Sequence, residues 1–210
     1  MLNVITVMLV DDHEIVRAGF KRLLDNTDDI SVIAEAATGE DAYNAYQQQS
    51  PDVVVMDLSM PPGVGGLEAI KRILAVAPEA RILVLTVQEC EPYPSRVLQA
   101  GAKGYLTKRC APEELIDAVR KVYHGREYVA PSIQKGLDGK EPSKLNNLTK
   151  RELQVFTQLA SGSSVAQIAE AMFISQKTVH VHRSNILSKL ELARTSDLIH
   201  LAIRHGIVEA

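Results

Sequence analysis

Residues 4–12 read Val4-Ile5-Thr6-Val7-Met8-Leu9-Val10-Asp11-Asp12, an apolar run that ends abruptly in two aspartates. Apolar residues on both faces of a short segment rich in β-branched side chains are typical of a strand buried on both sides of a parallel sheet. Similar runs recur at Ile30 to Ala34, Asp52 to Met56, Ala80 to Val87 and Gly104 to Leu106. The opening run is therefore the first of five predicted strands.

Segments with a helical spacing of apolar residues separate these strands. They run from Glu14 to Leu24, Glu40 to Gln48, Leu67 to Val76, Ser95 to Ala100 and Glu113 to Tyr123. Five βα repeats predict an open, doubly wound α/β domain with a five-stranded parallel sheet. We expect the strand order 2-1-3-4-5, which is that of flavodoxin-like sheets.

The chain changes character after about residue 125. Residues 126–146 are polar and interrupted by prolines and glycines, a composition typical of a linker. Helix starts then follow one another: capping-box patterns at Thr149 to Glu152 and at Ser164 to Gln167, a helix from Ser175 to about Leu190, and one capped by Thr195 that ends near Gly206. We predict an α/β domain at 1–125, a linker at 126–146 and a small all-α domain of four helices at 147–210.

The composition of the 210 residues, 46% apolar and 23% charged, is that of an ordinary globular protein. No apolar run approaches the roughly 18 residues that span a bilayer, and two lone cysteines fit neither a disulfide framework nor a zinc site, so we expect a cytoplasmic protein. Residues 1–125 hold 12 Lys and Arg against 18 Asp and Glu, a net charge of −6, whereas residues 147–210 hold 7 against 5, a net charge of +2. This asymmetry indicates different partners for the two parts.

Three aspartates follow predicted strands: Asp11 and Asp12 follow the first strand, and Asp57 follows the third. Ligands of an open α/β sheet bind beyond the carboxyl ends of its strands, and in the expected order the first and third strands are neighbours there. Clustered carboxylates repel one another unless a cation lies among them, and hard oxygen ligands suit Mg²⁺. A carboxylate in this position can also act as a nucleophile that forms an aspartyl-phosphate.

Two further polar residues lie at the ends of the fourth and fifth strands. Thr86 offers a hydroxyl and Lys108 an ammonium, and both would reach the edge at which a phosphoryl group on Asp57 needs hydrogen-bond donors. Taken singly, each of these residues has an ordinary explanation as a turn, cap, strand or surface residue. Five such groups on four strand ends of one sheet favour a site for phosphate and a cation.

This set of residues, with Met60-Pro61 after the third strand and Gly104 to Lys108 at the fifth, resembles the receiver domain of two-component response regulators. The resemblance covers residues 3 to about 124. It implies that Asp57 accepts phosphate from a sensor histidine kinase or its phosphotransfer domain. It also implies that Asp12, Asp57 and the backbone carbonyl of Ser59 ligate Mg²⁺, while Asp11 helps through water.

The same resemblance implies that Thr86 and Tyr105 form a switch pair. A hydroxyl drawn toward the phosphate would open a space into which the aromatic ring can turn. Simple burial of the ring is the alternative explanation for Tyr105. Residues 60–66 are one residue longer than the usual receiver loop, and the adjacent prolines Pro61 and Pro62 stiffen it.

The helix from Ser175 to about Leu190 is the most informative part of the C-terminal domain. Val179, Ile186 and Leu190 share a stripe that should face the bundle. The opposite stripe contains no acidic residue and suits a DNA major groove; it consists of Lys177, His180, Val181, Ser184 and Ser188. Arg183 and Lys189 flank it, where we expect phosphate contacts. With the helix before it, this segment predicts a helix-turn-helix, although a solvated face of a protein-binding bundle is the alternative.

A second resemblance covers about residues 146–208 and is to the LuxR-type DNA-binding domain. The residues that carry it are Leu148 to Glu152, Ser175, Thr178-Val179, His182, Ile186 and Lys189-Leu190. It adds Thr178 to the expected DNA-contacting residues. A receiver followed by this module resembles the NarL/FixJ class of regulators.

Within that class, several segments resemble the GacA/UvrY/SirA branch. These are Thr86-Val87, Pro92 to Arg96, Leu98 to Ala102 and Ala202 to Gly206. The resemblance implies a hybrid kinase of the GacS/BarA type as partner and promoters of small regulatory RNAs as main targets.

We therefore expect a phosphorylation-dependent transcription regulator, not an enzyme, that dimerises on phosphorylation, binds promoter DNA and acts on RNA polymerase. An aspartyl-nucleophile phosphohydrolase would need a general acid two residues after the nucleophile, where Ser59 serves poorly. A LuxR-type activator that senses a small molecule would need an apolar pocket, usually rich in aromatic residues, yet only 4% of the residues are aromatic and none is Trp. A protein-binding regulator without DNA contact is the third alternative.

Overall fold

The structure, a computed structural model, describes residues 4–60, 64–89, 92–137, 144–204 and 207. These residues fall into two compact units, one formed by the chain up to Glu89 and by Tyr93–Lys135, the other mainly by the chain from Gly136 onward. None of the helices within the described ranges is long and apolar enough to cross a membrane. Pro61 and Pro62 of the lengthened loop lie outside the described residues.

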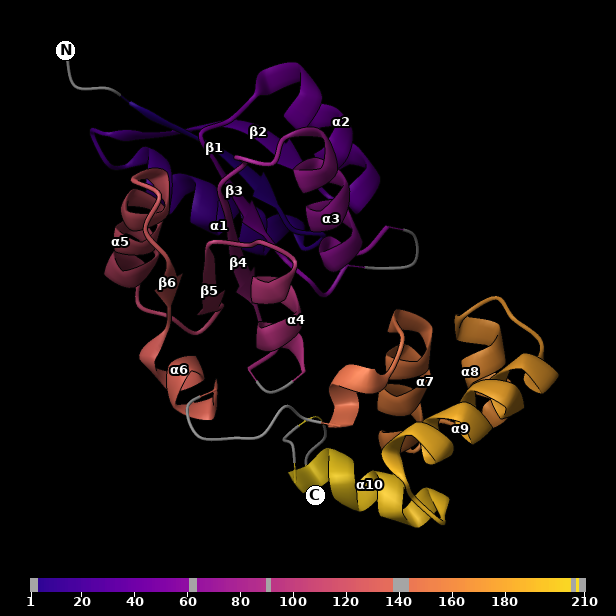
Figure 1. Cartoon of the computed structure of the whole chain (residues 1–210). Coiled ribbons are helices and arrows are strands. Elements are labelled where there is room, and N and C mark those ends of the chain that lie inside the picture. Colours follow the sequence, from indigo (N-terminus) through magenta and orange to yellow (C-terminus); the bar gives the residue numbers. More distant parts are fainter. Residues whose placement is uncertain (1–3, 61–63, 90–91, 138–143, 205–206, 208–210) are drawn as a thin grey trace. The chain divides into compact units, whose positions relative to one another are not determined.

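The first unit is built on a parallel sheet. Its strands are β1 (Ile5–Val10), β2 (Ile30–Ala36), β3 (Val53–Met56), β4 (Ile82–Thr86), β5 (Gly104–Thr107) and β6 (Tyr128–Val129). They lie in the order β2-β1-β3-β4-β5-β6, and all neighbouring pairs are parallel (Figure 1). Every residue of β3, β4 and β5 is buried, as their apolar runs predict. The predicted order 2-1-3-4-5 is confirmed.

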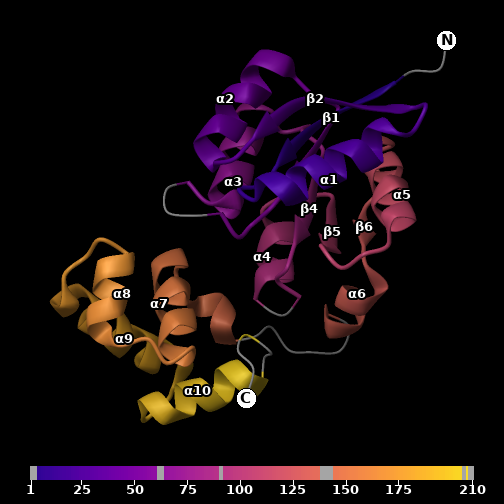
Figure 2. The ribbon, with the colours of Figure 1, turned by 180° about the vertical axis from the view of Figure 1, so that it is seen from behind.

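Helices cover both faces of this sheet. They are α1 (Glu14–Asp25), α2 (Gly39–Gln49), α3 (Gly66–Val76), α4 (Tyr93–Gln99) and α5 (Pro112–Tyr123). Figures 1 and 2 show α1 and α5 on one face and α2, α3 and α4 on the other. In α5, for example, Leu115, Val119 and Val122 are buried while the acidic and basic residues of its two ends are not. The prediction of a doubly wound α/β domain is confirmed.

The described part of the sheet has six strands, so the predicted number of five is wrong. The additional strand, β6, pairs with β5 and lies within residues 126–146, which the composition predicted as a linker. The Tyr128 backbone N–H donates to the Lys103 carbonyl at 2.9 Å. This close approach depends on Gly104, because a Cβ there would lie 2.9 Å from the Tyr128 carbonyl oxygen. A strand of two residues is too short to produce a hydrophobic period.

The described residues of the second unit form only helices. They are the 3₁₀ helix η1 (Lys144–Asn147) and the helices α7 (Lys150–Ala160), α8 (Val165–Ala171), α9 (Gln176–Leu190) and α10 (Thr195–Arg204). The short helix α6 (Pro131–Leu137) precedes them. Like β6, α6 and most of η1 lie in the predicted linker. Thr149 and Glu152 form the predicted capping box of α7, and Ser164 and Gln167 form that of α8. Ser175 caps α9 through its side chain. The prediction of a four-helix C-terminal domain is confirmed.

The start of α10 differs from the prediction. Thr195 is the first residue of the helix and not its cap. The backbone N–H of Arg194 donates instead to Asp197 Oδ2 at 2.9 Å. The acceptor for this N–H group therefore lies in the first turn of the helix and not in a side chain before it. A sequence pattern that looks for a capping residue before the helix does not predict this arrangement. The predicted end at Gly206 lies outside the described residues.

The turn between α8 and α9 contains a residue that is strained. Phe173 has a φ of 54° although it is not glycine, and it is 84% exposed. The left-handed conformation costs a bulky residue about 1–2 kcal/mol. An exposed ring recovers little of this cost through packing.

We expect Phe173→Gly to raise the free energy of unfolding of the second unit by about 0.5–1 kcal/mol, because the relief of strain exceeds the entropic cost of glycine. Urea denaturation followed by circular dichroism measures the change. Ser184→Gly, in the interior of α9, is the matched control and should lower the free energy of unfolding by about 0.5 kcal/mol. A loss of stability in Phe173→Gly would contradict the strain argument.

Candidate functional site

Four side chains meet beyond the carboxyl ends of β1 and β3. Asp11, Asp12, His13 and Asp57 each offer one ligand atom, and these atoms lie within 4.8 Å of one another. Asp57 is 1% and Asp11 5% exposed, whereas Asp12 is half-buried. The structure thus brings together the three predicted aspartates. It adds His13, which the sequence pattern did not indicate.

The neighbouring positions of β1 and β3 create this cluster. The Asp57 N–H donates to the Val10 carbonyl at 2.9 Å, and the Asp11 N–H donates to the Ala36 carbonyl at 3.1 Å. The backbone of each aspartate therefore continues the hydrogen bonds between neighbouring strands by one residue. Their side chains leave the sheet at the same edge, where the main chain turns toward the helices.

Lys108, which follows β5, reaches both buried carboxylates. Its Nζ lies 2.7 Å from Asp11 Oδ2 and 2.7 Å from Asp57 Oδ2, and its side chain is 11% exposed. Burial lowers the pKa of Lys108, but the hydrogen bonds and charges of the two aspartates outweigh burial and raise the pKa above its ordinary value. The ammonium therefore stays charged and balances the two most buried carboxylates.

One carboxylate oxygen of the cluster has no hydrogen-bond partner within the described part of the chain. Asp12 Oδ1 is buried and accepts no hydrogen bond from a described residue, although His13 Nδ1 lies 3.0 Å away and would form an ion pair with it if protonated. Beside it, the Ser59 N–H donates to Asp57 Oδ1 at 3.1 Å. A buried oxygen of this kind is costly unless a cation or water satisfies it. Three carboxylates with one unsatisfied oxygen fit a hard divalent cation.

Thr86 and Tyr105 lie on the neighbouring strands β4 and β5, and both are fully buried. The Gln88 N–H donates to Thr86 Oγ1 at 3.4 Å, a long hydrogen bond, and the Tyr105 hydroxyl donates to the Gln88 carbonyl at 2.7 Å. The main chain of one residue therefore links the two side chains. The sequence did not indicate Gln88, because any residue type supplies these backbone atoms.

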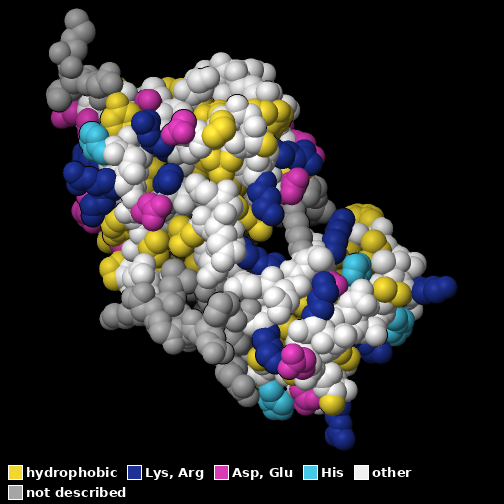
Figure 3. Space-filling model, in the orientation of Figure 1, with side chains coloured by type: hydrophobic (Ala, Val, Ile, Leu, Met, Phe, Trp, Pro, Cys, Tyr) yellow, Lys and Arg dark blue, Asp and Glu magenta, His cyan; other side chains and the backbone are white. Residues whose placement is uncertain are grey.

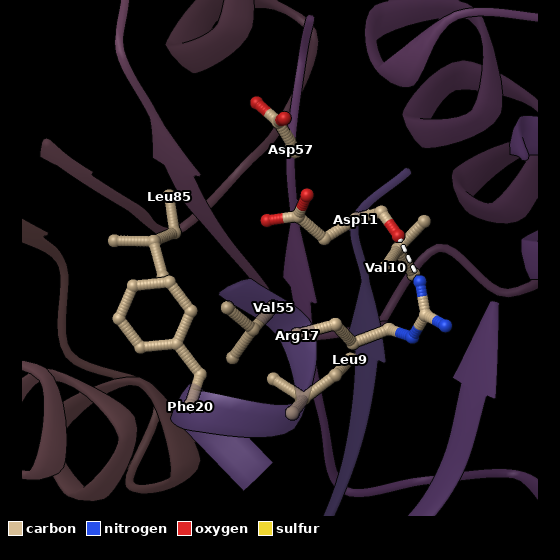
Figure 4. Close-up of a pocket in the computed structure, with 8 residues that line it drawn as sticks. All are labelled: Leu9, Val10, Asp11, Arg17, Phe20, Val55, Asp57 and Leu85. Atoms are coloured by element: carbon tan, nitrogen blue, oxygen red, sulfur yellow. Dashed lines mark hydrogen bonds between the residues drawn. The ribbon is translucent and has the colours of Figure 1, made fainter. Parts of the chain in front are cut away.

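A small pocket lies beneath the acidic cluster, as Figure 4 shows. Leu9, Val55 and Leu85 from the sheet and Phe20 from α1 line its apolar part, and the carboxylates of Asp11 and Asp57 lie at its polar end. An apolar surrounding of this kind strengthens the electrostatic interactions within the cluster.

The helix α9 carries the predicted surface of the second unit. Val179, Ile186 and Leu190 are at most 2% exposed and belong to the core. All five residues of the opposite stripe are exposed: Lys177, His180, Val181, Ser184 and Ser188. In Figure 3, Lys, Arg and His side chains lie on the surface of this unit, with some Asp and Glu side chains among them. The helices α8 and α9 and the turn between them therefore form a helix-turn-helix whose outward face has no acidic residue of α9.

The remaining predicted residues of α9 differ in their surroundings. Thr178 Oγ1 lies 2.8 Å from Ser175 Oγ at the start of the helix, and Arg183 is half-buried. Lys189 points to another helix, since its Nζ donates to Glu152 Oε2 at 2.7 Å. Its ammonium therefore has a carboxylate partner within the unit, although the residue is exposed, as Lys177 is.

Glu152 joins the start of α7 to the last turn of α9. It is 3% exposed, and its Oε2 accepts from the Thr149 N–H at 2.7 Å as well as from Lys189. Burial raises the pKa of Glu152, but the hydrogen bonds from Lys189 and Thr149 outweigh burial and hold the pKa below its ordinary value. The charged carboxylate therefore fixes α9 against α7.

Comparison with known proteins yields two family matches. Residues 7–120 match the response regulator receiver domain, and residues 146–202 match the bacterial regulatory proteins of the luxR family. The chain is 44% identical to the response regulator UvrY of Escherichia coli K12, over 98% of this chain and 97% of UvrY. It is 39% identical to the response regulator GacA of Pseudomonas aeruginosa, over 98% of this chain and 99% of GacA.

Two solved structures are similar over nearly the full length. The response regulator ChrA of a heme-sensing two-component system is 36% identical, with a TM-score of 0.57 over 99% of this chain and 100% of ChrA. RcsB, solved as dimers bound to DNA, is 26% identical, with a TM-score of 0.62 over 94% of this chain and 97% of RcsB.

We expect Lys189→Met to lower the free energy of unfolding of the second unit by about 1–3 kcal/mol at neutral pH, because it leaves buried Glu152 with one partner fewer. The folded-state pKa of Glu152 lies below its unfolded value of 4.5, so this stabilisation is present above that pH and is lost as the pH falls through the folded-state pKa. The difference between wild type and variant should therefore narrow in acid. Urea denaturation at several pH values measures it.

The matched control for this prediction is Lys177→Met, which removes an exposed lysine from the same helix. It should change the free energy of unfolding by less than about 0.5 kcal/mol. Equal losses in both variants, or a difference that stays constant in acid, would contradict the role assigned to the Glu152–Lys189 pair.

Proposed function

The chain belongs to the two-component response regulators in which a receiver domain precedes a LuxR-type DNA-binding domain, and we propose that it regulates transcription through phosphorylation of Asp57. The predicted resemblance to the NarL/FixJ class and its GacA/UvrY branch is confirmed by the two family matches and by the similarity to UvrY and GacA. Proteins of this family are regulators and not classical enzymes. The observation that carries the proposal is the buried Asp57–Lys108 pair beside Asp11 and Asp12.

Asp57 is the phospho-acceptor. One of its carboxylate oxygens attacks the phosphorus of a phosphohistidine, the O–P bond forms as the P–N bond breaks, and the bonding electron pair stays on the donor's nitrogen. Lys108 already donates to Asp57 Oδ2, so it is placed to donate to the phosphoryl oxygens. Attack by water on the same phosphorus returns the carboxylate and releases phosphate, which limits the lifetime of the signal.

Asp12, Asp57 and the backbone carbonyl of Ser59 would hold Mg²⁺, and Asp11 would contribute through water. The buried Asp12 Oδ1 supports this assignment, because no described residue gives it a hydrogen bond. When bound, the ion supplies positive charge that reduces the repulsion between the acidic cluster and an incoming phosphoryl group.

Thr86 and Tyr105 form the switch. The phosphoryl group draws the Thr86 hydroxyl toward itself and breaks the long hydrogen bond with the Gln88 N–H. Because the Tyr105 hydroxyl donates to the carbonyl of the same residue, a movement of Gln88 breaks this hydrogen bond to the ring. A buried pair with two arrangements is a bistable element that a covalent phosphate can bias.

The C-terminal domain, residues 147–210, binds promoter DNA through α9. The residues that reach the DNA are Lys177, Thr178, His180, Val181 and Ser184 in the major groove and Arg183 at the phosphates. The match to the luxR family and the exposed face of α9 support this assignment. We assign Lys189 to the Glu152 pair rather than to a phosphate, because its ammonium has that partner.

Phosphorylation promotes a homodimer that binds an inverted-repeat operator. RcsB, a relative in fold and sequence, has been solved as dimers on DNA, and two-fold pairing of helix-turn-helix domains matches a palindromic site. The net charge of +2 on residues 147–210 allows few phosphate contacts per monomer, so affinity depends strongly on dimerisation.

The partners follow from the branch to which the chain is similar. The identities of 44% to UvrY and 39% to GacA support a hybrid kinase of the GacS/BarA type as phosphodonor and small regulatory RNA genes as targets. Activation at such promoters involves RNA polymerase, and phosphotransfer from the kinase takes place in the cytoplasm.

Wild-type protein incubated with acetyl phosphate and Mg²⁺ should gain one phosphoryl group, and Asp57→Asn should gain none, because the amide is not a nucleophile. Intact-protein mass spectrometry detects the group, and sedimentation velocity detects the dimer that forms with it. Asp28→Asn removes an exposed aspartate of the same unit and serves as the matched control. Phosphate on Asp57→Asn at the wild-type level would refute Asp57 as acceptor.

On the DNA side, Lys177→Ala and Arg183→Ala should each weaken binding. Arg183→Ala should also reduce the slope of log affinity against log salt by about 1 for every DNA phosphate that its guanidinium neutralises in the wild type. Fluorescence anisotropy with a duplex selected from a random-sequence pool measures affinity between about 50 and 200 mM salt. Arg151→Ala, an exposed arginine of α7, changes the charge equally away from α9. An equal weakening in this control would show a general charge effect and not binding through α9.

A further inference from the structure

Arg17 of α1 bonds to the main chain of the acidic cluster. Its Nη1 lies 2.5 Å from the backbone carbonyl oxygen of Asp11, and its Nε lies 3.2 Å from Glu35 Oε2 on β2. The side chain is only 16% exposed. Figure 4 shows it reaching from α1 to Asp11. The guanidinium therefore connects the edge strand of the sheet to the segment that bears the aspartates.

Arg17 pairs with the carboxylate of Glu35, but within the acidic cluster it bonds to a backbone carbonyl and to no carboxylate in the described part of the chain. Here the carboxylates of Asp11 and Asp57 each bond to Lys108 at 2.7 Å. The two cations thus hold different parts of the cluster. Lys108 restrains the side chains, and Arg17 restrains the peptide group between Asp11 and Asp12.

The hydrogen bonds of Asp11 fix its backbone on both sides. Its N–H donates to the Ala36 carbonyl, its Oδ1 accepts from the His13 N–H at 2.9 Å, and its carbonyl accepts from Arg17. The peptide group that follows Asp11 sets the direction in which the Asp12 side chain leaves the main chain. The direction of Asp12, whose Oδ1 accepts no hydrogen bond from a described residue, is therefore set by the hydrogen bonds of Asp11.

Glu35 holds Arg17 in this position. It also accepts from Lys21 Nζ at 2.8 Å, and that hydrogen bond is the main cause that keeps the pKa of Glu35 below its ordinary value. The carboxylate is therefore charged at neutral pH, and it accepts from two cationic side chains of α1. A chain of contacts runs from β2 through Glu35 and Arg17 to the carbonyl of Asp11.

We propose that Arg17 is a positioning residue of the phosphorylation site, which fixes the Asp11–Asp12 peptide so that Asp12 is already directed to hold Mg²⁺ with Asp57. This inference rests on the proposed phospho-acceptor function. The charge of Arg17 acts in the opposite sense, because a positive group near the cluster repels a cation. If the hydrogen bond of Arg17 to Asp11 is the larger effect, removal of Arg17 weakens Mg²⁺ binding. If only the positive charge of Arg17 acts, its removal strengthens Mg²⁺ binding.

The test compares Mg²⁺ affinity, measured by isothermal titration calorimetry without phosphodonor, with the rate of phosphorylation by acetyl phosphate at increasing Mg²⁺. Arg17→Ala should raise the half-saturating Mg²⁺ concentration about tenfold in both measurements, the loss expected for a hydrogen bond to a charged group. The rate at saturating Mg²⁺ should stay within about twofold of wild type, because Asp57 and Lys108 are intact. Arg17→Lys, which keeps a donor, should restore part of the affinity.

Two further variants complete the comparison. Glu35→Gln keeps Arg17 but weakens its anchor, so it should shift the half-saturating Mg²⁺ concentration in the same direction by a smaller factor. Arg22→Ala removes an exposed arginine from the same helix and is the matched control, with Mg²⁺ affinity equal to that of wild type.

A folded Arg17→Ala that binds Mg²⁺ as tightly as wild type, or more tightly, overturns the inference. Thermal unfolding establishes whether the variant is folded; if it is not, an unchanged Mg²⁺ affinity in Glu35→Gln overturns the inference instead. A wild type that binds no Mg²⁺ and takes no phosphate refutes the proposed function, and this inference with it. If the wild type binds Mg²⁺ and takes phosphate, and Arg17→Ala has the same Mg²⁺ affinity as the wild type, only the role of Arg17 is refuted and the proposed function stands.

Discussion

The parallel pairing of β1 with β3 is the interaction on which the acidic site depends. Val10 and Met56 are register partners, so the residues that follow them, Asp11 and Asp57, leave the sheet at the same point. The repulsion between their carboxylates is offset by Lys108, which follows β5, two strands away from β3. The four strands β1, β3, β4 and β5 must therefore pair in register before the cluster is stable. The site is a property of the sheet and not of any local sequence motif.

That dependence explains why most of the site could be predicted. Strands buried on both faces produce continuous apolar runs, and the carboxyl ends of parallel strands share one edge, so the positions of Asp57, Thr86 and Lys108 at strand ends indicate their proximity. The same reasoning applies to α9, where the helical period separates a buried stripe, which includes Val179 and Ile186, from an exposed one. In both domains, regular backbone geometry converts sequence spacing into position.

The features that the sequence did not predict depend on backbone atoms, on very short elements or on the length of a side chain. β6 has two residues and depends on the bare backbone of Gly104, which leaves no hydrophobic period. Arg17 and Gln88 act on or through main-chain groups that carry no sequence signature. Lys189 flanks the outward stripe by helical angle, yet its stem is long enough for the ammonium to reach the buried Glu152 on another helix.

The lengths of the hydrogen bonds around Asp57 indicate which of them is the easiest to break. Lys108 bonds two carboxylates at 2.7 Å, and Tyr105 bonds the Gln88 carbonyl at 2.7 Å, whereas Thr86 and the Gln88 N–H are 3.4 Å apart. A phosphoryl group adds nearly two negative charges and three strong acceptors, and it competes for every donor in reach. The Lys108 ammonium already donates to two aspartates, so it can donate to the phosphoryl group only by weakening those hydrogen bonds. Turning costs the Thr86 hydroxyl only its long hydrogen bond, so in the proposed switch the response to phosphate begins at Thr86 and reaches Tyr105 through Gln88.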